Sequence, residues 1–188
     1  MKKIKSSALM LMASLLMNVS FGQNMAVEKT VEVGGAPMFP TKNIIENAVN
    51  SKDHSILVAA VKAAGLVETL QSAGPFTVFA PTNEAFNKLP AGTVETLVKP
   101  ENKMKLTGIL TYHVVAGRLG TKELDEWIKK GNGTAELTTV AGSKLWVMKK
   151  NNKYWLKDEN GGMATITIKN VYQSNGVIHV IDHVVLPK

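Results

Sequence analysis

The chain has 188 residues, no cysteine and a formal net charge of +7. Without cysteine it can form neither a disulfide scaffold nor a thiolate metal site, and it has no thiol nucleophile. Three of its lysines lie within the first five residues, and without them the net charge falls to +4. A charge of that size is small for a dedicated nucleic-acid binder, so we expect no nucleic-acid partner.

The first 22 residues have the pattern of a signal peptide. Three lysines precede an apolar stretch at 8–17, and small residues follow it. The stretch is too short for a membrane anchor, which needs roughly 20 residues; a buried N-terminal helix is the alternative. We expect residues 1–22 to be cleaved near Gly22–Gln23, and the mature protein to be secreted or periplasmic with no membrane span.

The segment 23–38 lacks clear periodicity. Its run Gly34-Gly35-Ala36-Pro37 is typical of a linker. We therefore predict an N-terminal tail or linker, which could pair with the edge of the domain. Residues 39–188 fit a single domain. A domain of this size buries roughly 70% of its unfolded surface and can be stable without disulfides.

Helical patterns dominate the first part of the domain, with apolar residues recurring at three- and four-residue spacing. Polar caps, glycine and proline separate the patterns. His54 falls on a polar face, so we expect it to be solvated. The candidate caps and stops are Thr41, Ser51, Asp53, Gly65 and Pro100, and the helical patterns cover 44–49, 56–64, 66–70, 93–98 and 104–110.

Residues 74–90 specify a strand-to-helix corner. A short strand rich in aromatic and β-branched residues at 76–80 ends at Pro81, because proline cannot donate to a sheet ladder. Thr82 stands where a helix N-cap belongs, and Glu84 favours the positive end of the helix dipole. The pattern is typical of a segment that folds and presents a surface, not of a catalytic site.

Strand patterns dominate from residue 112 onward, interrupted by an amphipathic helix at 121–129. The dipeptide Asn151-Asn152 predicts a tight hairpin, because asparagine tolerates positive φ. Helices followed by a mostly antiparallel sheet indicate an α+β fold. The predicted strands are 112–115, 135–140, 144–150, 153–158, 164–171 and 177–186.

Three sequence blocks together resemble the fasciclin (FAS1) domain family. They are GPFTVFAPTNEAF at 74–86, LTYHV at 110–114 and NGVIHVIDHVVLP at 175–187. Their order and separation are similar to those of the three motifs of that family, and the resemblance covers about 39–188. The motif residues are Thr82, Asn83, Phe86, Tyr112, His113, His179 and Asp182.

The resemblance implies a wedge-shaped β-sandwich of about seven strands with helices packed along one side. It also implies a non-catalytic, extracytoplasmic module for cell adhesion or matrix association. Its partner would be an unidentified protein or polysaccharide, and weak self-association stays open. The chain has no Arg-Gly-Asp tripeptide, so an animal-type receptor function is not carried over.

The histidines do not predict a metal site. His179 and His183 lie four residues apart on a predicted strand, which places them on one face about 13 Å apart, too far for one metal ion. Asp182 points to the opposite face. We expect Tyr112 and His113 to form a buried, hydrogen-bonded pair that ties the central strand to the C-terminal strand. A pH sensor and a hydrolase site around His113 are the alternatives.

No other set of residues predicts catalysis. The chain has no Gly-x-Ser-x-Gly nucleophile elbow, and the adjacent carboxylates Asp125 and Glu126 face different directions on one helix. The run 158–162 has oxygen ligands beside glycines but lacks the acidic spacing of a calcium loop. We therefore expect no enzyme activity, no metal and no cofactor.

The hairpin at 144–158 is the predicted binding surface. Aromatic rings beside ammonium groups suit anionic or sugar-rich polymers, and the hairpin lies outside the three blocks. Such a surface would make the chain a carbohydrate or small-ligand binding protein. The alternative is an aromatic row in the core with lysines on a solvated face. The candidate residues are Lys144, Trp146, Lys149, Lys150, Lys153, Tyr154, Trp155 and Lys157.

Overall fold

The structure is a computed structural model that describes residues 29–188. The predicted signal peptide lies outside the described residues. The first element is a hairpin of β1 (Val31–Val33) and β2 (Ala36–Met38). Its turn residues, Gly34 and Gly35, have φ of 59° and 73°, a region that glycine adopts without steric cost.

This hairpin packs against the rest of the domain, in a segment for which the sequence predicts a tail or linker that could pair with the edge of the domain. Val33, Ala36 and Met38 each expose less than a tenth of their surface and join the main hydrophobic core. Only these three residues mark the hairpin in the sequence. A pattern that short does not distinguish a pair of strands from a linker. The packed unit therefore includes residues 31–38.

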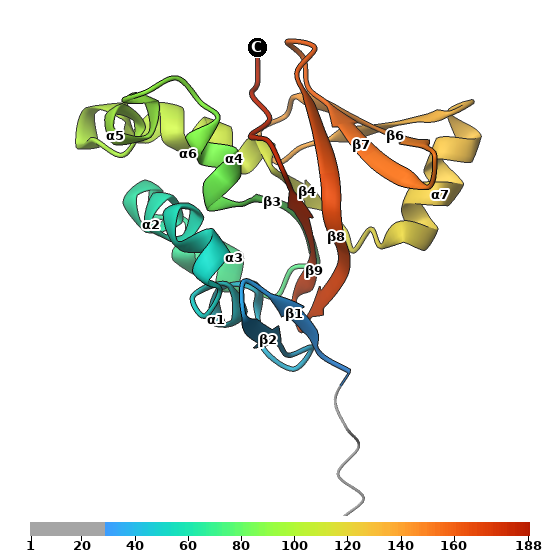
Figure 1. Cartoon of the computed structure of the whole chain (residues 1–188), viewed down its shortest axis with the longest axis horizontal. Helices are drawn as coiled ribbons and strands as arrows, with labels where there is room; N and C mark the ends of the chain where they lie inside the picture. The colour runs from blue at the N-terminus through green and yellow to red at the C-terminus, as the bar shows by residue number, and fades with distance from the viewer. Residues whose placement is uncertain (1–28) are drawn as a thin grey trace, which may run out of the picture.

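Short helices form one layer of the molecule, on the left of Figure 1. The cap of α1 is Asn43, not the expected Thr41: the Asn43 side chain accepts from the backbone N–H of Glu46, and the Glu46 side chain accepts from that of Asn43. The elements are α1 (Ile44–Ala48), η1 (Lys52–His54), α2 (Ser55–Ala64), α3 (Val67–Gln71), α4 (Asn83–Asn87), α5 (Thr93–Leu97), η2 (Pro100–Asn102) and α6 (Lys103–Tyr112).

A seven-stranded sheet lies beside this layer and runs in the order β4-β3-β9-β8-β7-β6-β5. All neighbouring strands are antiparallel except β3 and β9, which are parallel. The sheet and its helices confirm the predicted α+β fold. The strands are β3 (Phe76–Pro81), β4 (Val114–Ala116), β5 (Thr134–Thr138), β6 (Lys144–Lys150), β7 (Lys153–Lys157), β8 (Met163–Gln173) and β9 (Gly176–Ile181).

The sheet curls so that its two edges meet. Val115 of β4 forms a bridge with Thr139, and the N–H of Val140 donates to the carbonyl of Val114 at 2.7 Å. The long strand β8 belongs to both halves of the sheet and has register shifts between Ile166 and Val171 where it bends. The curl creates an inner face and an outer face.

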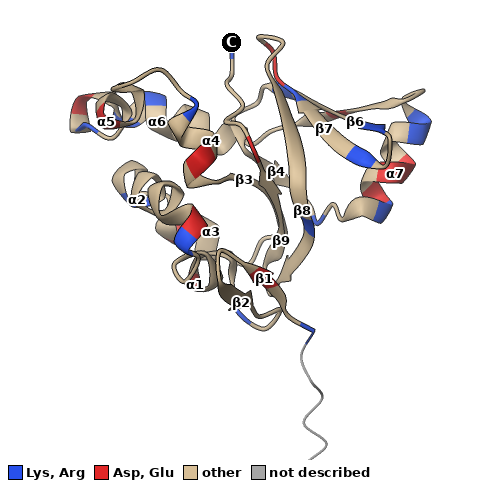
Figure 2. Ribbon diagram, in the orientation of Figure 1, with Lys and Arg blue, Asp and Glu red and all other residues tan. Residues whose placement is uncertain are grey.

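Two hydrophobic cores follow from this curl. One lies between helices α1–α6 and the strands β3, β9 and β8, and the other fills the inner face of the sheet. The helix α7 (Thr121–Lys130) closes the second core with Leu124 and Ile128. Strands β3 and β9 are buried on both faces, and Figure 2 shows no charged residue on either. Strands that are buried on both faces and lack charged residues are typical of parallel pairs.

Two predicted strand boundaries are wrong. Tyr112 is the last residue of α6 and His113 its C-cap, so β4 begins only at Val114. The final strand ends at Ile181, and residues 182–188 continue without regular structure. The β-branched run after Ile181 favoured a strand, but the chain leaves the sheet there. Among the described residues, no helix is long and apolar enough to cross a bilayer.

The N-cap of α4 gives a first prediction. Thr82 Oγ1 accepts from the N–H of Ala85 at 3.2 Å, so Thr82→Ala leaves that donor without its partner. We expect a loss of about 1 kcal/mol in the free energy of unfolding, measured by urea denaturation. Thr96→Ala, at an exposed position in α5, is the matched control and should change stability by less than about 0.5 kcal/mol. Equal losses in both variants would contradict the capping role.

Candidate functional site

The Tyr112 side chain joins the helical layer to the far half of the sheet. Its hydroxyl donates to the carbonyl of Lys144 at 2.6 Å and accepts from the N–H of Glu159 at 3.2 Å. The ring is fully buried in the inner core. Burial raises the pKa of Tyr112 to about 12, with the carboxylates of Glu159 and Asp158 acting in the same direction. The hydroxyl is therefore neutral and structural.

The His113 imidazole is committed to backbone partners on both sides. A carbonyl only accepts, so the 2.8 Å contact with Ile109 O places a proton on Nδ1. The other nitrogen, Nε2, then accepts from the N–H of Val185 at 3.3 Å. Burial lowers the pKa of His113 to about 4, so the ring is neutral at neutral pH. It ties α6 to the C-terminal segment and has no nitrogen free for a substrate.

His179, in the third sequence block, is also buried and hydrogen-bonded to the backbone. His179 donates from Nε2 to Leu119 O at 2.8 Å, accepts at Nδ1 from the N–H of Asn170 at 3.4 Å, and stacks on Phe79 with ring centroids 5.8 Å apart. Burial lowers the pKa of His179. A metal ion would need a free nitrogen on His179 and further ligating side chains nearby. Across residues 29–188 there is no group of three or more metal-binding side chains.

Asp182 lies just beyond β9. Its Oδ1 accepts from the N–H of Thr165 at 2.7 Å and lies 2.9 Å from Nδ1 of His183. Burial opposes ionisation, but these hydrogen bonds outweigh it and lower the pKa of Asp182. The carboxylate therefore fixes the end of the strand to β8.

The first block links helices to one another. The Asn83 side chain accepts from Ile56 N at 3.0 Å and donates to Lys52 O at 2.9 Å and to Ser55 Oγ at 3.0 Å. Phe86 is buried in the helical core. Together with the Thr82 cap, these contacts hold α4 against α2. The motif residues therefore build the scaffold, and their polar atoms have partners within the fold.

The predicted binding hairpin divides between two faces of the sheet. On one face, Tyr154 is 3% exposed, and its hydroxyl donates to Asp125 of α7 at 2.7 Å. Lys149 pairs with the same carboxylate at 2.8 Å. This ion pair lowers the pKa of Asp125, chiefly through the hydrogen bond from Lys149, and raises that of Lys149. Tyr154 and Lys149 therefore attach α7 to the hairpin and are not available as one binding surface with the tryptophans.

The remaining candidate residues of the hairpin lie together on the opposite face of the sheet, which is its outer face. Trp146 lies directly opposite Lys157 in the register, Met148 lies opposite Trp155, and Lys150 lies opposite Lys153. Both tryptophans are partly exposed. On the neighbouring strand, Glu136 accepts from Trp146 Nε1 at 3.3 Å and pairs with Lys144 at 3.0 Å. We call Lys144, Trp146, Met148, Lys150, Lys153, Trp155 and Lys157 the outer face.

A groove borders this outer face. It has a volume of about 460 Å³ and lies between the strands and the loop after β7. Its walls combine an aromatic ring, a thioether, an ammonium group and backbone amides: Thr134, Trp146, Met148, Lys157, Asp158, Glu159, Asn160 and Gly161 line it. A volume of 300–1,000 Å³ is typical of small-molecule sites. The groove can therefore accept a sugar-sized group against Trp146.

Not every polar group in the groove is free. Asp158 is 4% exposed and accepts from the N–H groups of Asn160, Gly162 and Leu186. Glu159 accepts from the N–H of Lys144 at 2.9 Å. These carboxylates hold the loop and the C-terminal segment in place. The partly exposed ring of Trp146 and the ammonium group of Lys157 remain as the groups of the groove that can contact a ligand.

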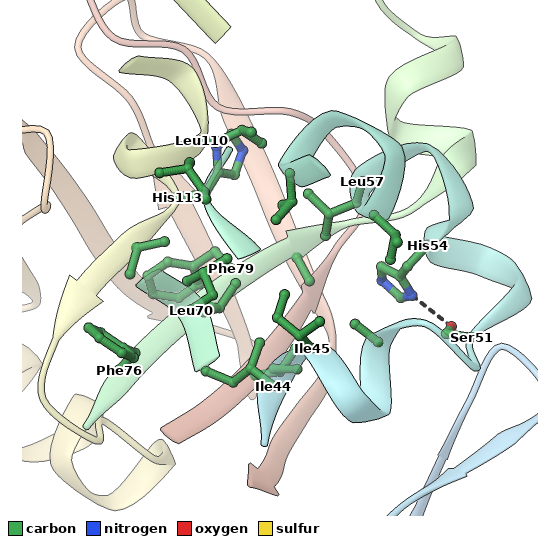
Figure 3. Close-up of a pocket in the computed structure, with 18 of the residues that line it drawn as sticks. Ile44, Ile45, Ser51, His54, Leu57, Leu70, Phe76, Phe79, Leu110 and His113 are labelled. Atoms are coloured by element: carbon green, nitrogen blue, oxygen red, sulfur yellow. Dashed lines mark hydrogen bonds between the residues drawn. The ribbon is translucent and has the colours of Figure 1, made fainter. Parts of the chain in front are cut away.

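The sequence pattern did not reveal a second hollow, next to His54. That histidine is 3% exposed, not solvated as expected, and its Nδ1 lies 2.8 Å from Ser51 Oγ. The reason is that η1 turns the ring inward against β3 before α2 begins. Figure 3 shows His54 at the edge of an apolar cavity, with Ile45 and Leu57 nearby. The sequence pattern around His54 does not indicate that the side chain points into the core.

Comparison with known proteins identifies the family. The Fasciclin domain model matches residues 52–187. Protein sll1483 of Synechocystis sp. is 45% identical over 169 residues, which cover 90% of this chain and 87% of that protein. The cell surface glycolipoprotein MPB83 of Mycobacterium bovis is 37% identical over 122 residues, covering 65% of this chain and 48% of that protein.

A solved structure shares the fold. The FAS1 domain pair of the insect cell adhesion molecule fasciclin I superposes with a TM-score of 0.70 at 18% identity, covering 85% of this chain and 58% of that chain. The curled seven-stranded sheet with its helical layer is therefore the fold of that domain. The residues of the three motifs form contacts within the fold, and the family model spans most of the described residues. The chain therefore belongs to the fasciclin domain family.

Proposed function

We propose that this chain is an exported, non-catalytic adhesion module that binds polymers of the cell surface or matrix through its outer face. The observation that carries the proposal is the open arrangement of Trp146, Trp155 and four lysines on strands whose other side packs on α7. Two of the similar proteins support it, because MPB83 is a cell surface glycolipoprotein and fasciclin I is a cell adhesion molecule.

The absence of catalysis is part of the proposal and is supported by the motif geometry. Both nitrogens of His113 and both of His179 have backbone partners. The Tyr112 hydroxyl is likewise occupied twice. A general base needs a free lone pair within reach of a substrate. These residues offer none, so we do not propose a hydrolase.

Carbohydrate recognition is the more specific candidate. A groove of about 460 Å³ beside Trp146 provides a flat ring for a sugar face and an ammonium group at Lys157 for its hydroxyl or acidic groups. Binding through stacking and exposed ammonium groups suits an acidic polysaccharide better than a neutral one. An array of acidic and neutral polysaccharides and matrix proteins distinguishes this candidate from protein-mediated adhesion.

The test is the double variant Trp146→Ala/Trp155→Ala. We expect its affinity for the best polymer on the array to fall at least tenfold, about 1.4 kcal/mol, because both rings leave the surface. Trp127→Ala, which removes an exposed tryptophan from α7, is the matched control and should bind like the wild type. A folded double variant, verified by circular dichroism, with unchanged affinity would overturn the proposal.

A further inference from the structure

The outer face has two ends that differ in charge. Alternate residues of β6 and β7 form successive rows across it: Lys150 lies opposite Lys153 at the hairpin end, and Trp146 lies opposite Lys157 beside the groove. The row between them contains Trp155. The first and last of these rows are four residues apart along β6, which corresponds to roughly 13 Å at about 3.3 Å per residue. A polymer that lies along the strands would therefore contact both ends.

The hairpin end carries positive charge alone. Lys150 and Lys153 are both exposed, and the turn between them consists of Asn151 and Asn152, so it contains no carboxylate. Among residues 29–188, neither lysine forms a salt bridge. Like charges that lie directly opposite each other on a sheet repel. An anionic group between the two ammonium groups would relieve this repulsion, so the hairpin end favours an acidic sugar.

The groove end has more carboxylates than ammonium groups. The charged side chains that line the groove are those of Lys157, Asp158 and Glu159. Hydrogen bonds from the backbone N–H groups of Lys144 and Lys188 lower the pKa of Glu159, so its side chain is ionised at neutral pH. An acidic sugar in the groove would meet more negative than positive charge. An uncharged sugar would not be repelled there.

Glu136 extends this charge pattern to the neighbouring strand. It lies directly opposite Trp146 in the register of β5 and β6. One of its oxygens accepts from Trp146 Nε1 at 3.3 Å, and the other pairs with Lys144 at 3.0 Å. The hydrogen bond from Lys144 lowers the pKa of Glu136, so the carboxylate is ionised at neutral pH. It therefore cancels the charge of Lys144 and fixes the edge of the indole ring.

We propose that the outer face recognises a linear acidic polysaccharide in which uncharged sugars separate the acidic ones. An uncharged sugar occupies the groove beside Trp146, and an acidic sugar lies between Lys150 and Lys153. Glu136 disfavours a polymer that is acidic at every sugar. This inference rests on the proposed function and deepens it, because it specifies the charge pattern of the polymer. Attraction by net positive charge alone would favour the polymer of highest charge density, which is the opposite order.

The experiment measures the affinity of the wild-type chain for fragments of three polysaccharides, matched in length, by isothermal titration calorimetry at one ionic strength. Unsulfated chondroitin alternates uncharged and acidic sugars, polygalacturonate is acidic at every sugar, and dextran is uncharged. We expect the chondroitin fragment to bind about threefold more tightly than polygalacturonate and about fivefold more tightly than dextran, which are differences typical of one or two exposed charge contacts.

Three variants assign the preference to residues. Lys150→Gln/Lys153→Gln should weaken chondroitin binding about fivefold and leave dextran binding unchanged, because only the acidic sugar loses its partners. Lys62→Gln/Lys105→Gln removes two exposed lysines from helices α2 and α6 and causes the same change in net charge. This matched control should bind like the wild type. Glu136→Gln should strengthen polygalacturonate binding about threefold, because the Lys144 ammonium group becomes free.

The outcomes separate this inference from the proposed function. All substituted side chains are exposed, and circular dichroism verifies the fold of each variant. If the wild type binds polygalacturonate as tightly as chondroitin, or if Glu136→Gln leaves the ratio of these two affinities unchanged, the inference is wrong and the proposed function stands. If the wild type binds none of the polymers on the wider array, the proposed function is wrong as well.

Discussion

Asn175→Ala is expected to be the most damaging single substitution outside the hydrophobic cores. The Asn175 side chain accepts from the N–H of Ile44 at 3.0 Å and donates to the carbonyls of Leu70 and Ser72, each at 2.8 Å. It is 5% exposed. Alanine leaves three backbone groups without partners, and each buried unsatisfied group costs about 1–3 kcal/mol. We expect a loss of about 3–5 kcal/mol and a Tm lower by about 10 °C.

The measurement is urea and thermal unfolding followed by circular dichroism. Asn160→Ala is the matched control, because Asn160 also bonds two carbonyls, Leu186 O and Pro187 O, but is exposed. Water can replace those bonds, so this variant should lose less than about 1 kcal/mol. Similar losses of unfolding free energy in the two variants would show that the contribution of the Asn175 amide to stability does not depend on its burial.

Acidification is expected to destabilise the domain before its carboxylates are protonated. The pKa of His113 is about 4 in the folded state, against 6.5 in the unfolded chain. Below pH 6.5 the unfolded state therefore binds a proton that the folded state does not, and the free energy of unfolding falls as pH falls. At about 1.4 kcal/mol per unit, His113 alone accounts for about 2 kcal/mol between pH 7 and pH 5.

Burial lowers the pKa of His54 and His179 as well, so these rings act in the same direction. Urea unfolding at pH 7, 6 and 5, followed by tryptophan fluorescence, measures the slope. His113→Gln should flatten it even if its stability at pH 7 is lower. Thr96→Ala, at an exposed position that contacts none of these histidines, should keep the slope of the wild type. An equal free energy of unfolding at pH 7 and pH 5 would contradict the neutral, buried state of His113.

The sequence predicted those parts of the fold that depend on local chemistry. The corner at Thr82 could be predicted because a strand, a proline and a cap follow one another along the chain. The α+β class and seven-stranded sheet could be predicted from the order of patterns and from the three family blocks. The cap at Asn43 was missed although the sequence contains its signature: Glu46 follows Asn43 by the three residues of a capping box, whereas Thr41 has Ile44 at that position.

The candidate site could be predicted only in part, because contacts between distant segments decide it. Strand alternation separates Trp146 from Tyr154 only once the register of β6 against β7 is known. The pairing of Asp125 with Lys149 joins α7 to a strand 24 residues away, and no local pattern encodes it. The inward turn of His54 depends on β3 and on Ser51. These features require the packed structure.

The position of β9 in the sheet has a consequence for the order of folding. This strand comes last in the chain, yet it lies in the sheet between β3 and β8 and pairs with β3 about 100 residues earlier. Contacts with such large sequence separation are typical of slow folding. Until Gly176–Ile181 is available, β3 lacks its parallel neighbour and neither hydrophobic core can close. Folding of this domain is therefore expected to follow the completion of its chain, because the last strand supplies the centre of the sheet.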